Sequence, residues 1–291
     1  MLNAKYRKAL PLEAKSASLA NPERRAFLTH GGSYFVALSI TAALPLALVS
    51  GQATAAQIAA DDTRIRAKRV AIDAQWGKLD CYFASPKADT APLPAVIVAH
   101  DKLGLTPHFE DVARRLAIEG FIALAPDYAS RFGGTPSESG PALEVVGMTK
   151  TVDMVSDTET ALLWLKANTT SSEKIGAVGF GLGATAIDYA ITRLPDLKAA
   201  AIFYGHPPPV ADLGNIKAPL LLNFASKDQF VGPEIPGLVD ALKKAGVKYE
   251  MFVYDNTEPG FDDETVRTRY SAEAAKLAWS RTVGFLKAAL S

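Results

Sequence analysis

The chain has 291 residues, 48% of them hydrophobic, which is enough apolar material to bury a sizeable core in one large or two small domains. Its 31 Lys and Arg residues balance 31 Asp and Glu residues, so no excess of positive charge favours nucleic acid as a partner. The single cysteine, Cys81, excludes an intramolecular disulfide framework and a multi-cysteine metal site. We therefore expect a soluble globular protein.

The first 56 residues differ in composition from the rest of the chain. The pair Arg24-Arg25 precedes a modestly apolar stretch without charged residues, and small residues at 53–56 follow it. This pattern resembles a twin-arginine export signal with its cleavage site. We predict a periplasmic or envelope protein. An uncleaved signal that anchors the chain is the alternative, although the apolar run 34–49 is shorter than the roughly 20 residues that span a bilayer.

Residues 57–69 are predicted to be a polar linker and residues 70–291 a single domain. Short β-type runs at 68–73 and 78–84 flank a turn, which predicts a hairpin. The unbroken apolar run 95–99 predicts a strand that is buried on both faces.

Strand and helix patterns then alternate to the end of the chain. Strands are predicted at 121–125, 199–204, 220–224 and 249–254, and a further strand starts at 175. Helices are predicted at 107–119, 151–167, 235–244 and 271–290, and a further helix starts at 182. The segment 130–141 is rich in Gly, Ser and Pro and is predicted to be a loop. This alternation predicts an α/β fold with a mainly parallel sheet and helices on both faces.

A glycine-spaced turn, Gly179-Phe180-Gly181-Leu182-Gly183, follows the strand that starts at Ile175. The turn has the form of a nucleophile elbow, Gly-x-Ser/Cys-x-Gly, in which a strained turn raises one reactive side chain above the sheet. Because the raised position is Gly181, we predict an elbow that lacks its nucleophile.

The segment from Ala95 to Ser291 resembles the dienelactone hydrolase family of α/β-hydrolase-fold enzymes. The resemblance is carried by His100-Asp101 with Gly104-Leu105, by Asp111 to Leu116 and Ala125-Pro126-Asp127, by Phe203-Tyr204-Gly205, by Ala218 to Leu222 with Lys227-Asp228, and by Gly260-Phe261 after Tyr254. It implies an α/β-hydrolase fold and a carboxylic ester or lactone hydrolase that needs no cofactor.

The resemblance also assigns the positions of a catalytic triad. It places the nucleophile at Gly181, the histidine at Pro259 and the acid at Asp228, so only the acid is retained. The covalent route needs a hydroxyl or thiolate nucleophile and a base for its proton. That route is therefore closed at these positions. By the same resemblance the amides of Leu182 and Lys102 form the oxyanion hole, which survives because it uses backbone groups.

Three residues near the predicted pocket offer other chemistry. Asp101 is expected to point toward the vacant nucleophile position, where burial raises a carboxyl pKa; a general base, a ligand contact and a solvated loop residue all stay open. His206 follows the strand 199–204, at the sheet edge where ligands bind in open α/β folds. It is either a substitute base or a plain loop or pocket-lining residue. His100 resembles a structural residue of the family and is included among the pocket residues. His108 starts a helix and is expected to be exposed.

Two other patterns suggest cofactors but fail a second requirement. The motif Gly179-x-Gly181-x-x-Ala184 resembles a dinucleotide fingerprint, but no acidic residue ends the next strand, so we predict no cofactor. An acidic cluster lacks the spacing of a calcium loop and is predicted to be a solvated turn without a metal. The cluster comprises Asp255, Glu258, Asp262, Asp263 and Glu264.

The leading hypothesis is therefore a non-catalytic protein whose former active site, above Gly181, binds a small ester, lactone or carboxylate, or a protein partner. The alternative is an ester or lactone hydrolase in which Asp101 or His206 activates water directly, with Asp228 and the two oxyanion-hole amides in support.

Overall fold

The structure is a computed structural model that describes residues 58–88, 92–169, 171 and 174–291. The predicted export signal, residues 1–56, lies outside the described residues. Among the helices that are described, none combines the length and apolar character needed to cross a membrane.

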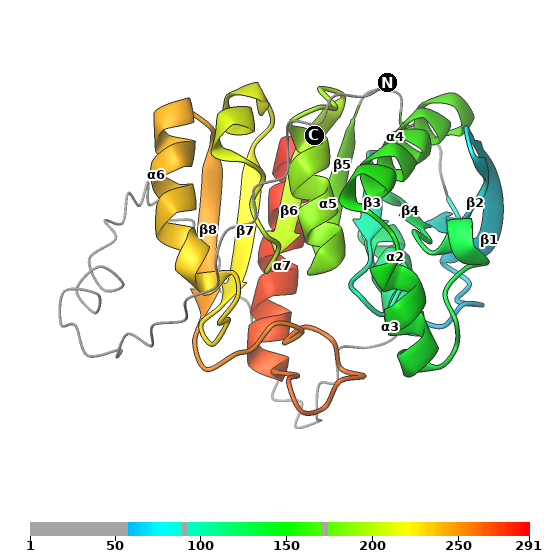
Figure 1. Ribbon diagram of the computed structural model, residues 1–291. Helices are drawn as coiled ribbons and strands as arrows, with labels where there is room; N and C mark the ends of the chain where they lie inside the picture. The colour runs from blue at the N-terminus through cyan, green and yellow to red at the C-terminus, as the bar shows by residue number, and fades with distance from the viewer. Residues whose placement is uncertain (1–57, 89–91, 170, 172–173) are drawn as a thin grey trace, which may run out of the picture. The chain divides into compact units, whose positions relative to one another are not determined.

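An eight-stranded sheet forms the centre of the domain, in the order β1-β2-β4-β3-β5-β6-β7-β8 (Figure 1). The strands are β1 (Ile65–Ala74), β2 (Gly77–Pro86), β3 (Ala95–Ala99), β4 (Ile122–Pro126), β5 (Ile175–Phe180), β6 (Leu197–Phe203), β7 (Leu220–Ala225) and β8 (Tyr249–Tyr254). β2 is antiparallel to both β1 and β4, and all other neighbours are parallel. The predicted α/β fold with a mainly parallel sheet is confirmed.

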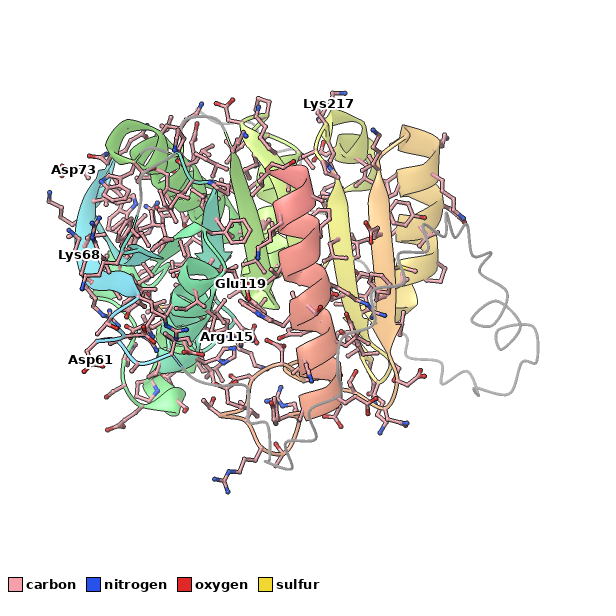
Figure 2. All side chains as sticks on the ribbon, turned by 180° about the vertical axis from the view of Figure 1, so that it is seen from behind. Asp61, Lys68, Asp73, Arg115, Glu119 and Lys217 are labelled. Atoms are coloured by element: carbon pink, nitrogen blue, oxygen red, sulfur yellow. The ribbon has the colours of Figure 1, made fainter. Side chains whose placement is uncertain are left out.

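Helices cover both faces of this sheet. They are α2 (Pro107–Ile118), α3 (Ser139–Gly147), α4 (Thr151–Asn168), α5 (Leu182–Ile191), α6 (Ile235–Ala245) and α7 (Ala272–Ala289). α2 and α7 pack on one face, where α7 runs nearest the viewer in Figure 2, and α4, α5 and α6 pack on the other. The central strands β3 and β5 are buried at every position because both of their faces are covered.

Two segments differ from their sequence-based predictions. β1 begins at Ile65, inside the predicted linker 57–69, because Ile65 is buried and the strand pairs with β2 from Ile65 to Ala74. α3 begins at Ser139, inside the predicted loop 130–141. Pro141 lies in the first turn of α3, where a missing N–H costs no helical hydrogen bond.

The two edges of the sheet differ in charge. The edge strand β1 exposes three cationic side chains, Arg66, Lys68 and Arg69, together with Asp73. The edge strand β8 exposes Glu250 as its only charged residue, and Val253 in the same strand is 39% exposed.

Candidate functional site

A carboxylate lies over Gly181 at the elbow between β5 and α5. Gly181 has φ 50° and ψ −110°, a backbone conformation that favours glycine. A Cβ atom on Gly181 would lie 2.1 Å from Oδ1 and 2.6 Å from Cγ of Asp101. The space that the sequence leaves at Gly181 is therefore occupied by the Asp101 side chain, which comes from the loop after β3.

A backbone amide binds this same carboxylate. The N–H of Leu182, at the start of α5, donates to Oδ1 of Asp101 at 3.0 Å. The amide of Lys102 also acts on the carboxyl and lowers its pKa. Both amides were expected to hold an oxyanion, so under that expectation Asp101 accepts from a donor that a substrate oxyanion would need.

The surroundings of Asp101 shift the pKa of its carboxyl group. Burial raises the pKa of the Asp101 carboxyl, and the bonds from the Leu182 and Lys102 amides oppose that rise. The carboxylate of Asp262 raises this pKa as well, because the two groups are near enough to repel. The residue as a whole is nevertheless partly exposed.

His100 supports the loop that carries Asp101. Its ring has no solvent exposure. The N–H of Tyr128 donates to Nε2 at 3.0 Å, so the ring proton of the neutral form lies on Nδ1, which donates to the carbonyl of Asp101 at 2.8 Å. Burial lowers the pKa of His100, against the opposing charge of Asp127, and favours this neutral form. Because both ring nitrogens are used, we correct the inclusion of His100 among the ligand-binding residues.

Asp228, predicted as the acid, is hydrogen-bonded through only one of its two carboxylate oxygens. Asp228 follows β7 and is buried, and its Oδ1 accepts from the N–H groups of Phe230 and Val231 at 2.9 and 3.0 Å. Its Oδ2 is buried without a hydrogen-bond partner among the described residues. Pro259, on the loop after β8, has no donor to offer, and its carbonyl accepts from Arg269. One carboxylate oxygen is therefore left unsatisfied.

His206 lies on the surface just beyond β6. Its N–H donates to Oγ1 of Thr185 at 3.0 Å, and its Nδ1 lies 3.1 Å from Oε2 of Glu234. The side chains of His206 and Glu234 are 52% and 43% exposed, which makes this an exposed pair. Sequence reasoning did not single out Glu234, because it lies on a separate short segment, the 3-10 helix η3 (Gly232–Glu234).

His108 lies inside a cluster of acidic side chains. The residue is only 2% exposed, although an exposed helix start was predicted. Its Nδ1 lies 3.4 Å from Oδ1 of Asp263 and 3.4 Å from Oε2 of Glu264, and its Nε2 lies 3.7 Å from Oδ2 of Asp262. These acids, predicted as a solvated turn, have side chains only 11–17% exposed. The prediction for His108 was wrong, and so was the solvated turn for these three acids, because the loop after β8 folds over the first turn of α2. Asp255 and Glu258, the other two acids of that predicted turn, are exposed.

The electrostatics of this cluster favour a positive charge on His108. Burial alone would lower the pKa of His108, but the carboxylates of Asp262, Glu264 and Asp263 outweigh burial and raise it to about 10. The hydroxyl of Tyr204 donates to Oδ1 of Asp262 at 2.5 Å. Tyr204, just after β6, has φ 43°, a left-handed conformation that is rare outside glycine. The end of β6 is therefore tied to the cluster.

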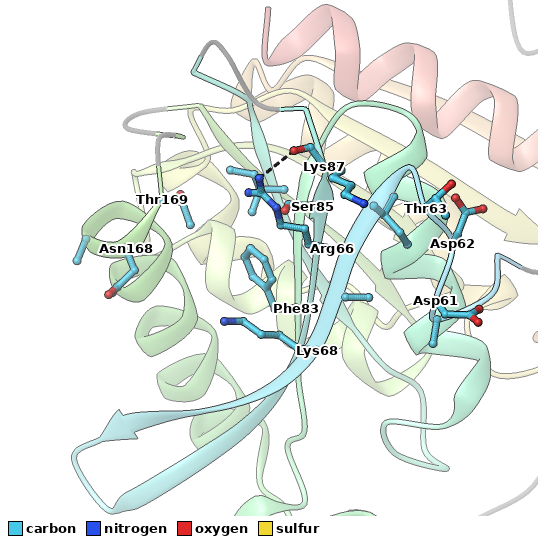
Figure 3. Close-up of a pocket in the computed structure, with 15 residues that line it drawn as sticks. Asp61, Asp62, Thr63, Arg66, Lys68, Phe83, Ser85, Lys87, Asn168 and Thr169 are labelled. Atoms are coloured by element: carbon cyan, nitrogen blue, oxygen red, sulfur yellow. Dashed lines mark hydrogen bonds between the residues drawn. The ribbon is translucent and has the colours of Figure 1, made fainter.

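A separate groove lies at the edge of the sheet that β1 and β2 form (Figure 3). It has a volume of about 750 Å³ and is lined by charged and polar side chains from β1, β2 and the end of α4. The guanidinium of Arg66 donates to the carbonyl of Lys87 at 2.9 Å across it, as the dashed line marks. The groove borders Ile122, where β4 begins, whereas Asp101 follows the end of β3. It therefore includes none of the residues at the elbow.

Comparison with known sequences identifies the family. Residues 79–290, which make up most of the chain, match the family described as "Dienelactone hydrolase family". The chain belongs to the dienelactone hydrolase family.

Relatives of this dienelactone hydrolase family member match along most of their length. The "Putative carboxymethylenebutenolidase" of Escherichia coli (strain K12) is 28% identical over 240 residues, covering 78% of this chain and 88% of that protein. "Protein usf" of Aquifex pyrophilus is 32% identical over 218 residues, covering 72% and 93%. The crystal structure of a "Putative Dienelactone Hydrolase" from Klebsiella pneumoniae superposes with a TM-score of 0.71 at 26% identity, covering 77% of this chain and 98% of that one.

At the elbow of this dienelactone hydrolase family member, the Asp101 carboxylate lies over Gly181 and accepts from the N–H of Leu182. Asp228 follows β7, and Pro259 lies on the loop after β8.

Proposed function

We propose that this dienelactone hydrolase family member binds a small ligand at the former active site and does not form an acyl-enzyme. The observation that carries the proposal is the position of Asp101. Its Oδ1 lies 2.1 Å from the place of a Cβ at position 181 and accepts the N–H of Leu182. A nucleophilic side chain and this carboxylate cannot occupy the elbow together.

The acid position supports the same proposal. In a triad the acid holds a histidine in the right tautomer and stabilises its charged form. With Pro259 at the histidine position, Asp228 has no imidazole at that position to orient, and its Oδ2 has no hydrogen-bond partner. Removing triad members leaves only the residual rate that the oxyanion hole and binding supply, and in this proposal Asp101 competes for one of the oxyanion-hole donors, the N–H of Leu182.

The chemistry of the site narrows the class of ligand. An ester, a lactone or a carboxylate would need the amides that Asp101 already holds, and a carboxylate would also be repelled by an ionised Asp101. A hydroxyl or ammonium group, in contrast, donates to a carboxylate. We therefore favour a small ligand that donates hydrogen bonds over the ester, lactone or carboxylate that the sequence suggests.

Thermal shift assays on the full chain test this proposal with two sets of compounds: small polyols and amines, and matched lactones and carboxylates. We expect stabilisation by members of the first set and a weaker shift in Asp101→Asn, because a ligand that binds only the folded state raises its stability. Stabilisation by carboxylates alone, unchanged in Asp101→Asn, would contradict the proposed ligand class.

Esterase and lactonase assays on the same protein test the non-catalytic part. We expect no turnover above the rate in buffer. Turnover that disappears in Asp101→Ala or His206→Ala would instead establish the alternative, a hydrolase that activates water directly. Turnover that persists in both variants would place catalysis elsewhere in the chain.

We also propose that the chain is exported to the periplasm, on the strength of Arg24-Arg25 and the uncharged stretch that follows. Cell fractionation tests this with the double substitution Arg24→Lys and Arg25→Lys. We expect the variant to stay in the cytoplasm. Equal export of variant and wild type would contradict a twin-arginine route.

A further inference from the structure

His108 and the loop after β8 bring three potential metal ligands together. The ligand atoms are Nδ1 of His108, Oδ1 of Asp263 and Oε2 of Glu264, and all three lie within 4.8 Å of one another. His108 comes from the first turn of α2, whereas the two acids lie about 150 residues later in the chain, between β8 and α7. Both ring nitrogens of His108 are buried without a hydrogen-bond partner, although the ring faces these acids.

We propose that His108, Asp263 and Glu264 bind a first-row divalent cation, with Zn²⁺ as the best fit. Imidazole nitrogen and carboxylate oxygen ligands lie roughly 2.0–2.2 Å from Zn²⁺, and a tetrahedral angle between two such ligands separates them by about 3.4 Å. The Nδ1 of His108 lies 3.4 Å from each of the two carboxylate oxygens. The fourth position of the ion is left for water. The site does not depend on the ligand proposed for the elbow.

A carboxylate also lies near the other ring nitrogen of His108, on the side where metal-bound histidines usually have one. Such histidines donate their second ring N–H to a carboxylate or carbonyl, which fixes the ring and raises its basicity. The Nε2 of His108 lies 3.7 Å from Oδ2 of Asp262. Asp262 is in turn held by the hydroxyl of Tyr204 at 2.5 Å. The chain of contacts from Tyr204 through Asp262 to His108 therefore orients the imidazole for a ligand on its Nδ1 side.

The negative charge of the cluster also favours the binding of a cation. Three carboxylates, from Asp262, Asp263 and Glu264, face His108 from positions only 11–17% exposed. The guanidinium of Arg115 also acts on the cluster and stacks 3.8 Å from the ring centroid of Trp279 in α7; Figure 2 labels Arg115 beside this helix. A divalent ion would add positive charge next to the three carboxylates.

Binding of Zn²⁺ to the full, tag-free chain tests the proposal by equilibrium dialysis and titration calorimetry. We expect one ion per chain. Glu264→Gln and Asp263→Asn keep the side-chain volume and lower the negative charge, so both should fold, and each should weaken binding at least tenfold. Asp262→Asn should weaken it by about 10–100-fold, as a residue that orients a metal ligand does. Co²⁺ in place of Zn²⁺ should give the visible absorption of a tetrahedral ion.

The matched control is His206→Gln, which removes an exposed histidine that also faces a carboxylate. It should leave the stoichiometry and affinity unchanged. Binding that is absent in the wild type, or equal in the wild type, Asp263→Asn and Glu264→Gln, would overturn the proposal. Loss of binding in His206→Gln alone would assign the ion to the surface pair instead. Circular dichroism of each metal-free variant separates lost ligands from lost folding.

Discussion

The elbow and the His108 cluster both bury carboxylates, but they satisfy them differently. At the elbow one carboxylate, Asp101, accepts from the backbone N–H of Leu182. In the cluster three carboxylates surround His108 at ion-pair distances that do not form hydrogen bonds. The comparison shows that the Asp101 carboxylate has a backbone donor, whereas the ring nitrogens of His108 have no hydrogen-bond partner among the described residues.

The largest expected effect comes from removing the cation of the cluster. His108→Ala leaves three mostly buried carboxylates without their imidazole, and breaking a buried ion pair by removing one partner costs about 3–5 kcal/mol. Urea denaturation measures the loss. His206→Ala removes one partner of an exposed pair and should change the free energy of unfolding by less than about 0.5 kcal/mol. Equal effects of the two substitutions would show that the His108 cluster is not a buried ion-pair network.

Gly181→Ala tests whether Asp101 fills the elbow. The substitution puts a Cβ 2.1 Å from Oδ1 of Asp101 and a side chain on a backbone with φ 50°. We expect a loss of about 1–3 kcal/mol from backbone strain and a further contribution from the clash. In an Asp101→Ala background the clash is gone, so Gly181→Ala should cost less there. A double-mutant cycle without coupling between the two sites would contradict the observed packing.

Substitutions of Asp228 are expected to have an effect of intermediate size on stability, and its size depends on the residue introduced. Asp228→Ala removes the acceptor of the N–H groups of Phe230 and Val231, and each unsatisfied buried donor costs about 1–3 kcal/mol. Asp228→Asn keeps an oxygen for both donors and removes the charge of the unpartnered Oδ2. We expect the Asn variant to be clearly more stable than the Ala variant in thermal unfolding, and its stability to be equal to that of the wild type or higher. An Asn variant as unstable as the Ala variant would mean that the charge itself is required.

The smallest expected effect is the pH dependence of Asp101. The pKa of this carboxyl is raised above its ordinary value of 3.8, chiefly by burial. The stability that this raised pKa contributes is fully present below pH 3.8 and is lost as the pH rises through the folded-state pKa. Asp101→Asn should therefore gain stability over the wild type as the pH rises from about 4 toward neutrality. A difference between the two proteins that stays constant with pH would contradict a raised pKa.

The sequence predicts the scaffold well because its signals are local. The apolar run 95–99, the elbow turn and the helix from Leu182 are set by neighbouring residues, and the structure has them at these positions. The orientation of Asp101 toward Gly181 also follows from the elbow, because only a residue without a side chain leaves room there.

The His108 cluster could not be predicted in the same way. Residue 108 is part of a helical pattern, and this pattern does not predict which segment covers the first turn of α2. Its partners, 262–264, lie on a long loop whose path is fixed by Phe261, a buried anchor, and by the bond from Tyr204 to Asp262. Contacts between residues so far apart in the sequence depend on tertiary packing. α3 was missed for a different reason, because Ser139, Gly140 and Pro141 are poor helix formers in general but are accepted in a first turn.

The unequal edges of the sheet have a consequence for how the protein associates when it is partly unfolded. An exposed edge strand offers unpaired backbone groups to another chain, and charged side chains on the edge oppose such pairing. Two β1 edges would bring Arg66, Lys68 and Arg69 against their copies, whereas two β8 edges meet with Glu250 as the only charged residue exposed in each strand. Aggregates formed during refolding should therefore grow through β8, and a lysine at Val253 should slow them.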